Sequence, residues 1–216
     1  MKKSVLLMTI IVCLFALATS PQAVAISYDL DVVLSGSTLP VPQSPTLKAT
    51  FADTPSGKVE LKMEAIDLPN AAQYVKAWDF NFDDSLNAQS LKFVPVVDYI
   101  VFTPAPVNVA GLFDFSLQFG NENFKNGVTL TVDITYENLI APATITAASF
   151  DFLSDPNAIS PDAPRHTAAM VAQGANSGWI ADNTNPVNPV PEPATILLLG
   201  AGLVGLAGFG RKKLIK

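Results

Sequence analysis

The 216-residue sequence predicts an all-β protein with a single antiparallel β-sandwich, of the jelly-roll or Ig-like kind. Apolar and polar residues alternate with a period of two in about nine short stretches, so each stretch has one apolar face. Turns rich in Gly, Pro, Asn and Ser separate the stretches, and no part of the body carries a helical apolar stripe. Strands that each hide one side need a second layer, which predicts two packed sheets.

The alternation places the expected strands in order along the chain. Their apolar positions are Tyr28, Leu30, Val32 and Leu34; Leu47, Ala49 and Phe51; Val59, Leu61, Met63 and Ala65; Trp78, Phe80 and Phe82; Phe113, Phe115, Leu117 and Phe119; Val128, Leu130, Val132 and Ile134; and Phe150 and Phe152. The run from Leu91 to Phe102 is less regular, and Pro95 predicts a break or an edge within it. The segment from Ser154 to Pro164 is expected to be a loop. Residues 26–182 therefore form one predicted domain.

Residues 1–25 have the features of a signal peptide with an N-terminal signal helix. Two lysines precede an apolar run from Val5 to Ala18, which is short for a membrane span. Ala23 and Ala25 supply the small residues that signal peptidase requires, so the mature chain is expected to begin at Ile26. A retained N-terminal anchor is the alternative.

The C-terminus consists of a stalk and an apolar segment. Residues 183–193 are rich in Pro and Asn and end in a Pro-Glu-Pro motif. Residues 194–210 are uncharged and apolar, near the lower length limit for a transmembrane helix. The basic cluster Arg211, Lys212 and Lys213 follows and is expected to stay in the cytoplasm. Residues 194–216 are therefore predicted to be a transmembrane helix with a basic tail, which places the body on the exported side of the inner membrane.

This order of motif, apolar helix and basic cluster resembles the PEP-CTERM sorting signal. The matching motif residues are Val190, Pro191, Glu192, Pro193, Ala194 and Thr195. The resemblance implies recognition by an exosortase, a membrane protease with a transpeptidase role, which cuts near the motif. It also implies an inner-membrane intermediate, followed by transfer to the cell surface or extracellular matrix of a Gram-negative bacterium that makes exopolysaccharide. A plain C-terminal membrane anchor is the alternative.

The body is similar to an uncharacterised β-rich group of PEP-CTERM proteins. The residues that carry this similarity are Trp78 to Asp83, Gly111 to Phe115, His166 to Ala169 and Ser177 to Ile180. The similarity implies one extracellular domain and no particular activity. In that group a second His usually follows the Ala-Ala pair, whereas Met170 stands there in this chain.

Charge and cysteine content exclude several function classes. Residues 26–193 hold only seven of the 13 basic residues but all 19 acidic residues. Such an acidic body repels phosphate backbones, so nucleic-acid binding is not expected. The one cysteine, Cys13, lies in the N-terminal apolar run. Disulfides, cysteine-ligated zinc and cysteine nucleophiles are therefore not expected in the body.

A calcium site is one candidate for chemistry in the body. Asp79, Asn81, Asp83 and Asp84 offer oxygen ligands where a predicted strand passes into a loop. No EF-hand loop is present, because the required Gly and terminal Glu are missing. A solvated turn is the alternative.

The single histidine and the tryptophans are the other candidates. His166 could form a Ser-His-Asp arrangement with Ser160 and Asp162, but no nucleophile elbow supports it. A histidine in a loop or at a strand edge is the simpler interpretation. Trp179 could stack on a sugar, whereas Trp78 alternates with phenylalanines and is expected in the core.

The sequence thus predicts a non-enzymatic, exported surface or matrix protein that is processed by signal peptidase and an exosortase. The first alternative is a carbohydrate-binding module for the cell's own exopolysaccharide, which requires an exposed aromatic pair beside polar groups. A secreted hydrolase is the second alternative. It requires a cleft with converging carboxylates, such as the pair Asp29 and Asp31, or with His166.

Overall fold

The computed structural model describes residues 24–34, 45–94, 99–102, 110–120, 123–138, 143–156, 161–162 and 164–183. All of them belong to one compact unit, Val24–Pro189. The predicted signal helix, the stalk beyond Asn183 and the predicted C-terminal helix lie outside the described residues, apart from Val24 and Ala25. Among the described residues, no helix is long and apolar enough to cross a membrane.

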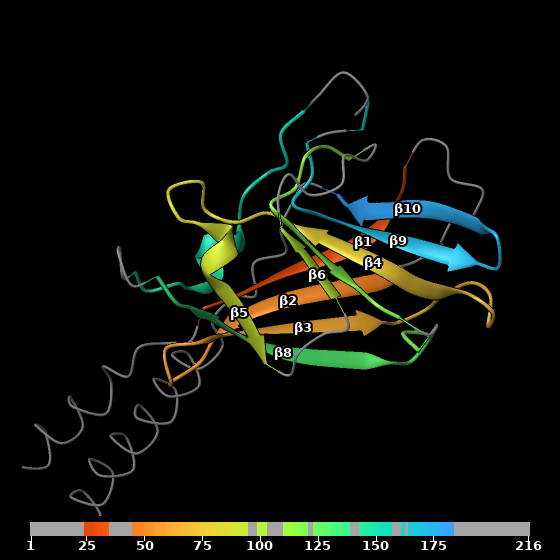
Figure 1. Cartoon of the computed structure of the whole chain (residues 1–216). Coiled ribbons are helices and arrows are strands. Elements are labelled where there is room, and N and C mark those ends of the chain that lie inside the picture. The colour runs from red at the N-terminus through yellow and green to blue at the C-terminus, as the bar shows by residue number, and fades with distance from the viewer. Residues whose placement is uncertain are drawn as a thin grey trace, which may run out of the picture. The chain divides into compact units, whose positions relative to one another are not determined.

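The described part of the chain forms ten strands and two short 3-10 helices (Figure 1). Their bounds are β1 Ala25–Val33, β2 Leu47–Asp53, β3 Val59–Ala65, β4 Tyr74–Phe80, η1 Ala88–Ser90, β5 Leu91–Val94, β6 Tyr99–Phe102, β7 Phe115–Gln118, β8 Thr129–Tyr136, η2 Ala147–Phe150, β9 Thr167–Gln173 and β10 Asn176–Asp182. Every pairing of neighbouring strands is antiparallel. The antiparallel β prediction is therefore confirmed.

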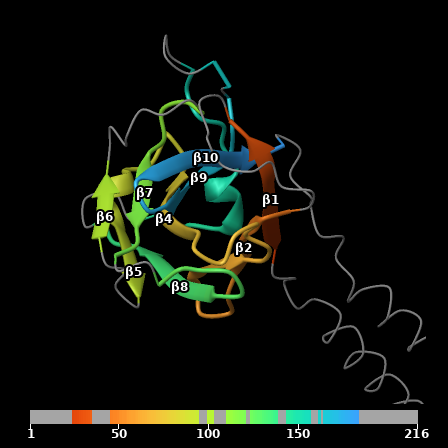
Figure 2. The same cartoon turned by 90° about the vertical axis from the view of Figure 1, so that its right-hand side faces the viewer.

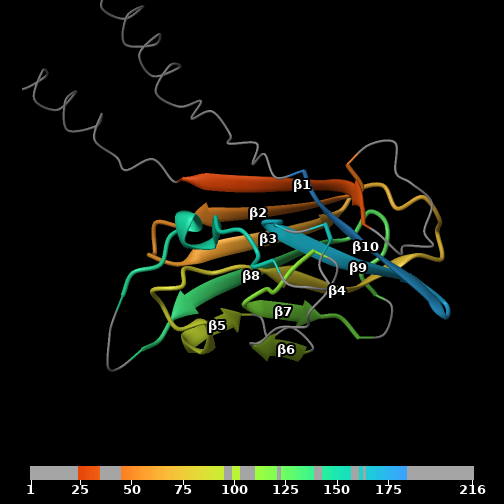
Figure 3. The same cartoon turned by 90° about the horizontal axis from the view of Figure 1, so that it is seen from above.

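The strands lie in one sheet, in the order β5-β8-β3-β2-β1-β10-β9-β4-β7-β6. The sheet curls around the core, so that β1 lies on one side of it and β5, β6 and β7 lie on the other (Figures 2 and 3). The ring centroids of Phe93 in β5 and Phe115 in β7 are 5.6 Å apart, so opposite ends of the sheet meet across the core. The two separate sheets of a sandwich are not confirmed, because β1 and β10 are paired and join the two halves.

Most strands lie where the alternation places them. In β3 the apolar side chains are buried at every second position, as expected for a strand with one solvent-exposed face. The irregular run after Leu91 divides into β5 and β6, with residues 95–98 outside the description. Pro95 falls between the two strands, in agreement with the predicted break.

The strand predicted at Phe150 and Phe152 is wrong. Phe150 ends the 3-10 helix η2, and Phe152 lies beyond it and is exposed. Polar side chains stabilise this helix start: the backbone N–H of Thr146 donates to Oγ of Ser149, and that of Ala147 donates to Oδ1 of Asp53. The hairpin of β9 and β10 was not predicted.

The register shifts in two strands, and in β1 the shift places side chains of one strand on opposite faces of the sheet. Leu30 pairs with Asp182 and Val32 pairs with Ala181, so Asp31 is an extra residue in β1. Before the shift, Leu30 belongs to the main core inside the curl. After it, Leu34 packs in a second apolar cluster with Ala110, Phe113, Ala168 and Ala181. A second shift in β4 lies at Lys76, between Val75 and Ala77.

Candidate functional site

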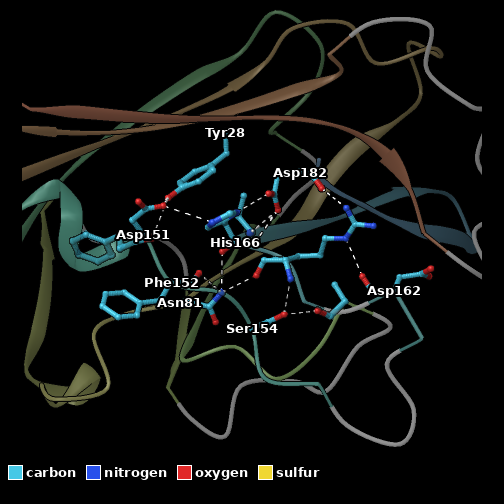
Figure 4. A network of polar contacts seen from close by, with 12 residues as sticks. Tyr28, Asn81, Asp151, Phe152, Ser154, Asp162, His166 and Asp182 are labelled. Carbon is cyan, nitrogen blue, oxygen red and sulfur yellow. Dashed lines mark hydrogen bonds and ion pairs between the residues drawn. The ribbon is translucent and has the colours of Figure 1, made fainter. Parts of the chain in front are cut away.

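A network of polar contacts, drawn in Figure 4, lies where β10 ends. It brings together four side chains. Tyr28 lies in β1 and Asp182 ends β10, while Asp151 directly follows η2 and His166 directly precedes β9. These positions are far apart in the sequence, and the curl of the sheet gathers them at one place.

His166 lies between two carboxylates. Its Nδ1 is 2.9 Å from Oδ2 of Asp182, and its Nε2 is 3.6 Å from Oδ1 of Asp151. The imidazole also stacks on the ring of Tyr28, with centroids 5.0 Å apart and planes inclined by 22°. The side chain is almost completely buried. His166 is therefore held on three sides, and no serine or threonine hydroxyl of the described residues bonds to its ring.

Asp182 receives hydrogen bonds from one short run of backbone. Its Oδ1 accepts from the backbone N–H groups of His166, at 3.0 Å, and Thr167, at 3.1 Å. Nη1 of Arg165 donates to the backbone carbonyl of Asp182 at 2.7 Å. With the imidazole contact, these bonds attach the last residue of β10 to three consecutive residues. Since the side chain is only 2% exposed, these partners compensate for its burial.

Tyr28 connects β1 to the segment after η2. Its hydroxyl donates to Oδ1 of Asp151 at 2.7 Å and approaches the carbonyl of Phe150 at 3.4 Å. Burial, followed by the hydrogen bond to Asp151, raises the pKa of the Tyr28 phenol above its usual value. The phenol is therefore a hydrogen-bond donor throughout the physiological range, and it is not poised to accept a proton.

Two further side chains fix the backbone around His166. Nδ2 of Asn81 donates to the carbonyls of Phe152, Arg165 and His166 at 3.0 to 3.1 Å. Oγ of Ser154 accepts from the backbone N–H of Arg165 at 3.0 Å and donates to the carbonyl of Ala110. Asn81 and Ser154 thus hold together segments that lie outside the named strands, and each bond of this part of the network ties backbone to a side chain.

The residues predicted as calcium ligands lie at the end of β4 and in the segment that follows it. Asp79 and Asn81 are buried, whereas Asp83 and Asp84 lie in a turn after β4. Oδ1 of Asp83 accepts from both the backbone N–H and the hydroxyl of Ser85. Within the ranges that the structure describes, no group of three or more His, Cys, Asp or Glu side chains is placed to hold a metal ion.

The two tryptophans differ in exposure. Trp78 is completely buried, and its indole N–H donates to Oγ1 of Thr167. The prediction that it belongs to the core is confirmed. Trp179 is half-buried and packs against the second apolar cluster. The two rings therefore do not form the exposed pair that sugar stacking requires.

The remaining candidates differ in how far the structure describes them. Ser160 lies outside the described residues, and the contact of Asp162 with Arg165 uses its backbone carbonyl. Asp29 forms an ion pair with Lys48 on the outer face. The sequence pointed to His166 and Asn81 but missed Tyr28, Asp151 and Asp182, because these are isolated residues with no motif around them.

Comparisons with known proteins identify the C-terminal segment. Residues 189–212 match the family model of the PEP-CTERM protein-sorting motif. No curated protein and no solved structure matches the chain. The matched range contains the predicted motif residues, from Val190 to Thr195, and the first two residues of the basic cluster, Arg211 and Lys212. The chain carries a PEP-CTERM sorting motif after a β-rich body, which supports export and exosortase-dependent sorting to the cell surface.

Proposed function

We propose that this chain is a surface or extracellular-matrix protein of a Gram-negative bacterium, associated with biofilm and exopolysaccharide, and that its body has no enzymatic activity. The observation that carries the proposal is the sorting motif at residues 189–212. The motif begins seven residues after β10 ends at Asp182, so a folded body is followed closely by the processing signal. In this proposal signal peptidase acts after Ala25, and an exosortase acts between Pro191 and Thr195.

The polar contacts of the body support a structural role. His166 is occupied by Asp182, Asp151 and the ring of Tyr28, so it is not presented to a substrate. The outer face of β2, β3 and β8 carries charged and threonine side chains. It includes ion pairs between Lys58 and Asp133 at 3.0 Å and between Lys62 and Glu64 at 2.8 Å. Such a face remains hydrated, which suits a domain displayed outside the cell.

The carbohydrate-binding alternative has less support. Stacking on a sugar needs exposed aromatic faces, and Trp78 is fully buried. Trp179 presents only part of its surface, because it packs against the second apolar cluster. If this alternative were correct, Trp179→Ala would abolish retention of the chain on the cell's own exopolysaccharide without loss of stability.

The intact mass of the protein in the envelope and matrix fractions of its host tests the proposal. We expect a chain that begins at Ile26 and ends between Pro191 and Thr195, with any added mass identifying the final anchor. Glu192→Ala should block processing, whereas Asn188→Ala, just outside the matched motif, should leave it unchanged. A wild-type chain that still ends at Lys216 would identify the tail as a plain membrane anchor and contradict the proposal.

A further inference from the structure

We propose that Arg165, His166 and Thr167 form a clamp on Asp182 that fixes where strand β10 ends. The clamp thereby sets the number of residues between the end of β10 and the sorting motif. This inference rests on the proposed function, because it assigns Asp182 a positioning role in the sorting reaction. Residues 183–190 then separate the end of β10 from Pro191 in the precursor.

The clamp lies where the hydrogen-bonded pairing of β10 with β9 ends. The last pair between β10 and β9 is Ala181 with Ala168. Continuing the register would place Asp182 opposite Thr167, but Oδ1 of Asp182 accepts there from the N–H groups of His166 and Thr167. A side-chain carboxylate thus takes the place of a strand carbonyl. The end of β10 thereby gains two hydrogen bonds to a carboxyl group. Hydrogen bonds to a charged acceptor are stronger than those between neutral groups.

Two further contacts hold the same residue. The imidazole of His166 meets Oδ2, and the guanidinium of Arg165 donates to the Asp182 carbonyl. On its other side Asp182 pairs with Leu30 of β1, while the next residue, Asn183, is exposed. The clamped residue is therefore the last buried residue of β10, and it is followed directly by an exposed one.

The clamp matters because strand ends fray. Terminal residues open with free energies near zero unless they are tied down. Fraying of β10 would add residues to the spacer and expose the buried side chains of Ile180 and Ala181 to proteases. With the clamp closed, the number of residues between the end of β10 and the motif stays constant, and a protease acting on the tail meets the end of β10 at a fixed place.

Hydrogen exchange and limited proteolysis on the full-length chain in detergent micelles test the clamp directly. Asp182→Ala should accelerate amide exchange in β10 by about tenfold or more, while β2 and β3 keep their protection. Subtilisin digestion should then move the C-terminal end of the protected fragment from Asn183 or beyond to the N-terminal side of Asp182. Asp182→Asn keeps an oxygen acceptor for both N–H groups and should restore most of the wild-type behaviour.

Two other variants make the result specific. Asp133→Ala removes a carboxylate that is 37% exposed and paired with Lys58, and it should leave β10 unchanged. Arg165→Ala removes one contact of the clamp and should shift exchange in the same direction by a smaller factor. If Asp182→Ala fails to fold, the Arg165→Ala variant still tests the clamp. Equal exchange of β10 in the wild type, Asp182→Ala and Arg165→Ala would overturn the clamp.

A spacing experiment in the host tests the positioning role. Deletion of residues 184–187 from the full-length chain should lower the processed fraction several-fold, because the motif then lies closer to the domain. Adding Asp182→Ala to this deletion should recover part of the processing, since a frayed β10 supplies residues to the spacer; a structural defect alone would not do this. Normal processing of the deleted chain, or no recovery, would overturn the positioning role. Wild-type chain that is never cut would instead contradict the proposed function.

Discussion

The indole N–H of Trp78 donates to Oγ1 of Thr167 over 2.8 Å, and the same hydroxyl donates to the backbone carbonyl of Asp79 over 2.7 Å. One hydroxyl therefore satisfies a buried side chain of β4 and a buried backbone carbonyl of the same strand. Thr167 begins β9, the neighbour of β4, so this bond ties the two strands where the register places Trp78 opposite Ala169. An indole can be buried without penalty only when its N–H has such a partner.

Thr167→Val should destabilise the domain by about 1–3 kcal/mol, because it leaves the Trp78 N–H and the Asp79 carbonyl without this hydroxyl in a buried site. Thr167→Ser keeps the hydroxyl and should lose less. Urea unfolding followed by tryptophan fluorescence measures both. A smaller loss for Thr167→Val than for Thr167→Ser would show that the methyl group of Thr167, and not its hydroxyl, stabilises this contact.

Phe150 contributes to the main core although it lies outside the strands. Its ring stacks on Phe51 with centroids 4.4 Å apart and planes inclined by 8°. Phe150→Ala should therefore lower the free energy of unfolding by about 3–5 kcal/mol. Phe152→Ala removes the same ring from a side chain that is 36% exposed, and thermal unfolding should show a much smaller effect. Similar losses for both would contradict the placement of Phe150.

Gly111 is required by space as well as by its backbone conformation. Its φ is +123°, and a Cβ there would meet the side chain of Ser154 and the carbonyl of Asp155. Gly57 also has a positive φ, +74°, but a Cβ there meets nothing within 4 Å. Gly111→Ala should therefore destabilise the fold more than Gly57→Ala, which carries only the cost of about 1–2 kcal/mol for an L-residue in this region. Chemical denaturation of the two variants measures the difference.

Tyr28 should make the fold sensitive to alkali. The pKa of the Tyr28 phenol is raised in the folded state. The stability that the protonated phenol contributes is therefore complete below the pKa of the unfolded chain, near 10, and is lost as pH rises above that value. The stability difference between the wild type and Tyr28→Phe should narrow above about pH 10. Tyr136 is the control, because hydrogen bonds from Asn87 and Asn138 lower its pKa. For Tyr136→Phe the difference should widen over the same range, and parallel pH profiles would contradict both assignments.

The sequence predicts a strand well when only one of its faces is buried. In β3 the residues Val59, Leu61, Met63 and Ala65 are buried and their neighbours are not, so the alternation is complete. In β9 both Ala168 and Ala169 are fully buried, on opposite faces of the sheet. A strand covered on both faces does not alternate, and for this reason the last hairpin was missed.

The spacing of residues along the chain gave a wrong prediction at one place and no signal at another. Phe150 and Phe152 stand two residues apart, as in a strand, but one is buried by a 3-10 turn and the other is exposed. The partners of His166 come from positions 28, 151 and 182. Only the folding of the sheet brings these together, so no pattern in the neighbourhood of His166 could indicate them.

The first and last of the described strands, β1 and β10, are neighbours in the middle of the sheet. During synthesis β10 is the last of the described strands to emerge, so β1 pairs with it late, and until then both halves of the sheet present an unpaired edge. A chain that stops before residue 176 lacks the joining strand altogether. The contact that joins the two halves is therefore also the one that spans almost the whole length of the described chain, which makes it among the slowest kind of pairing to form.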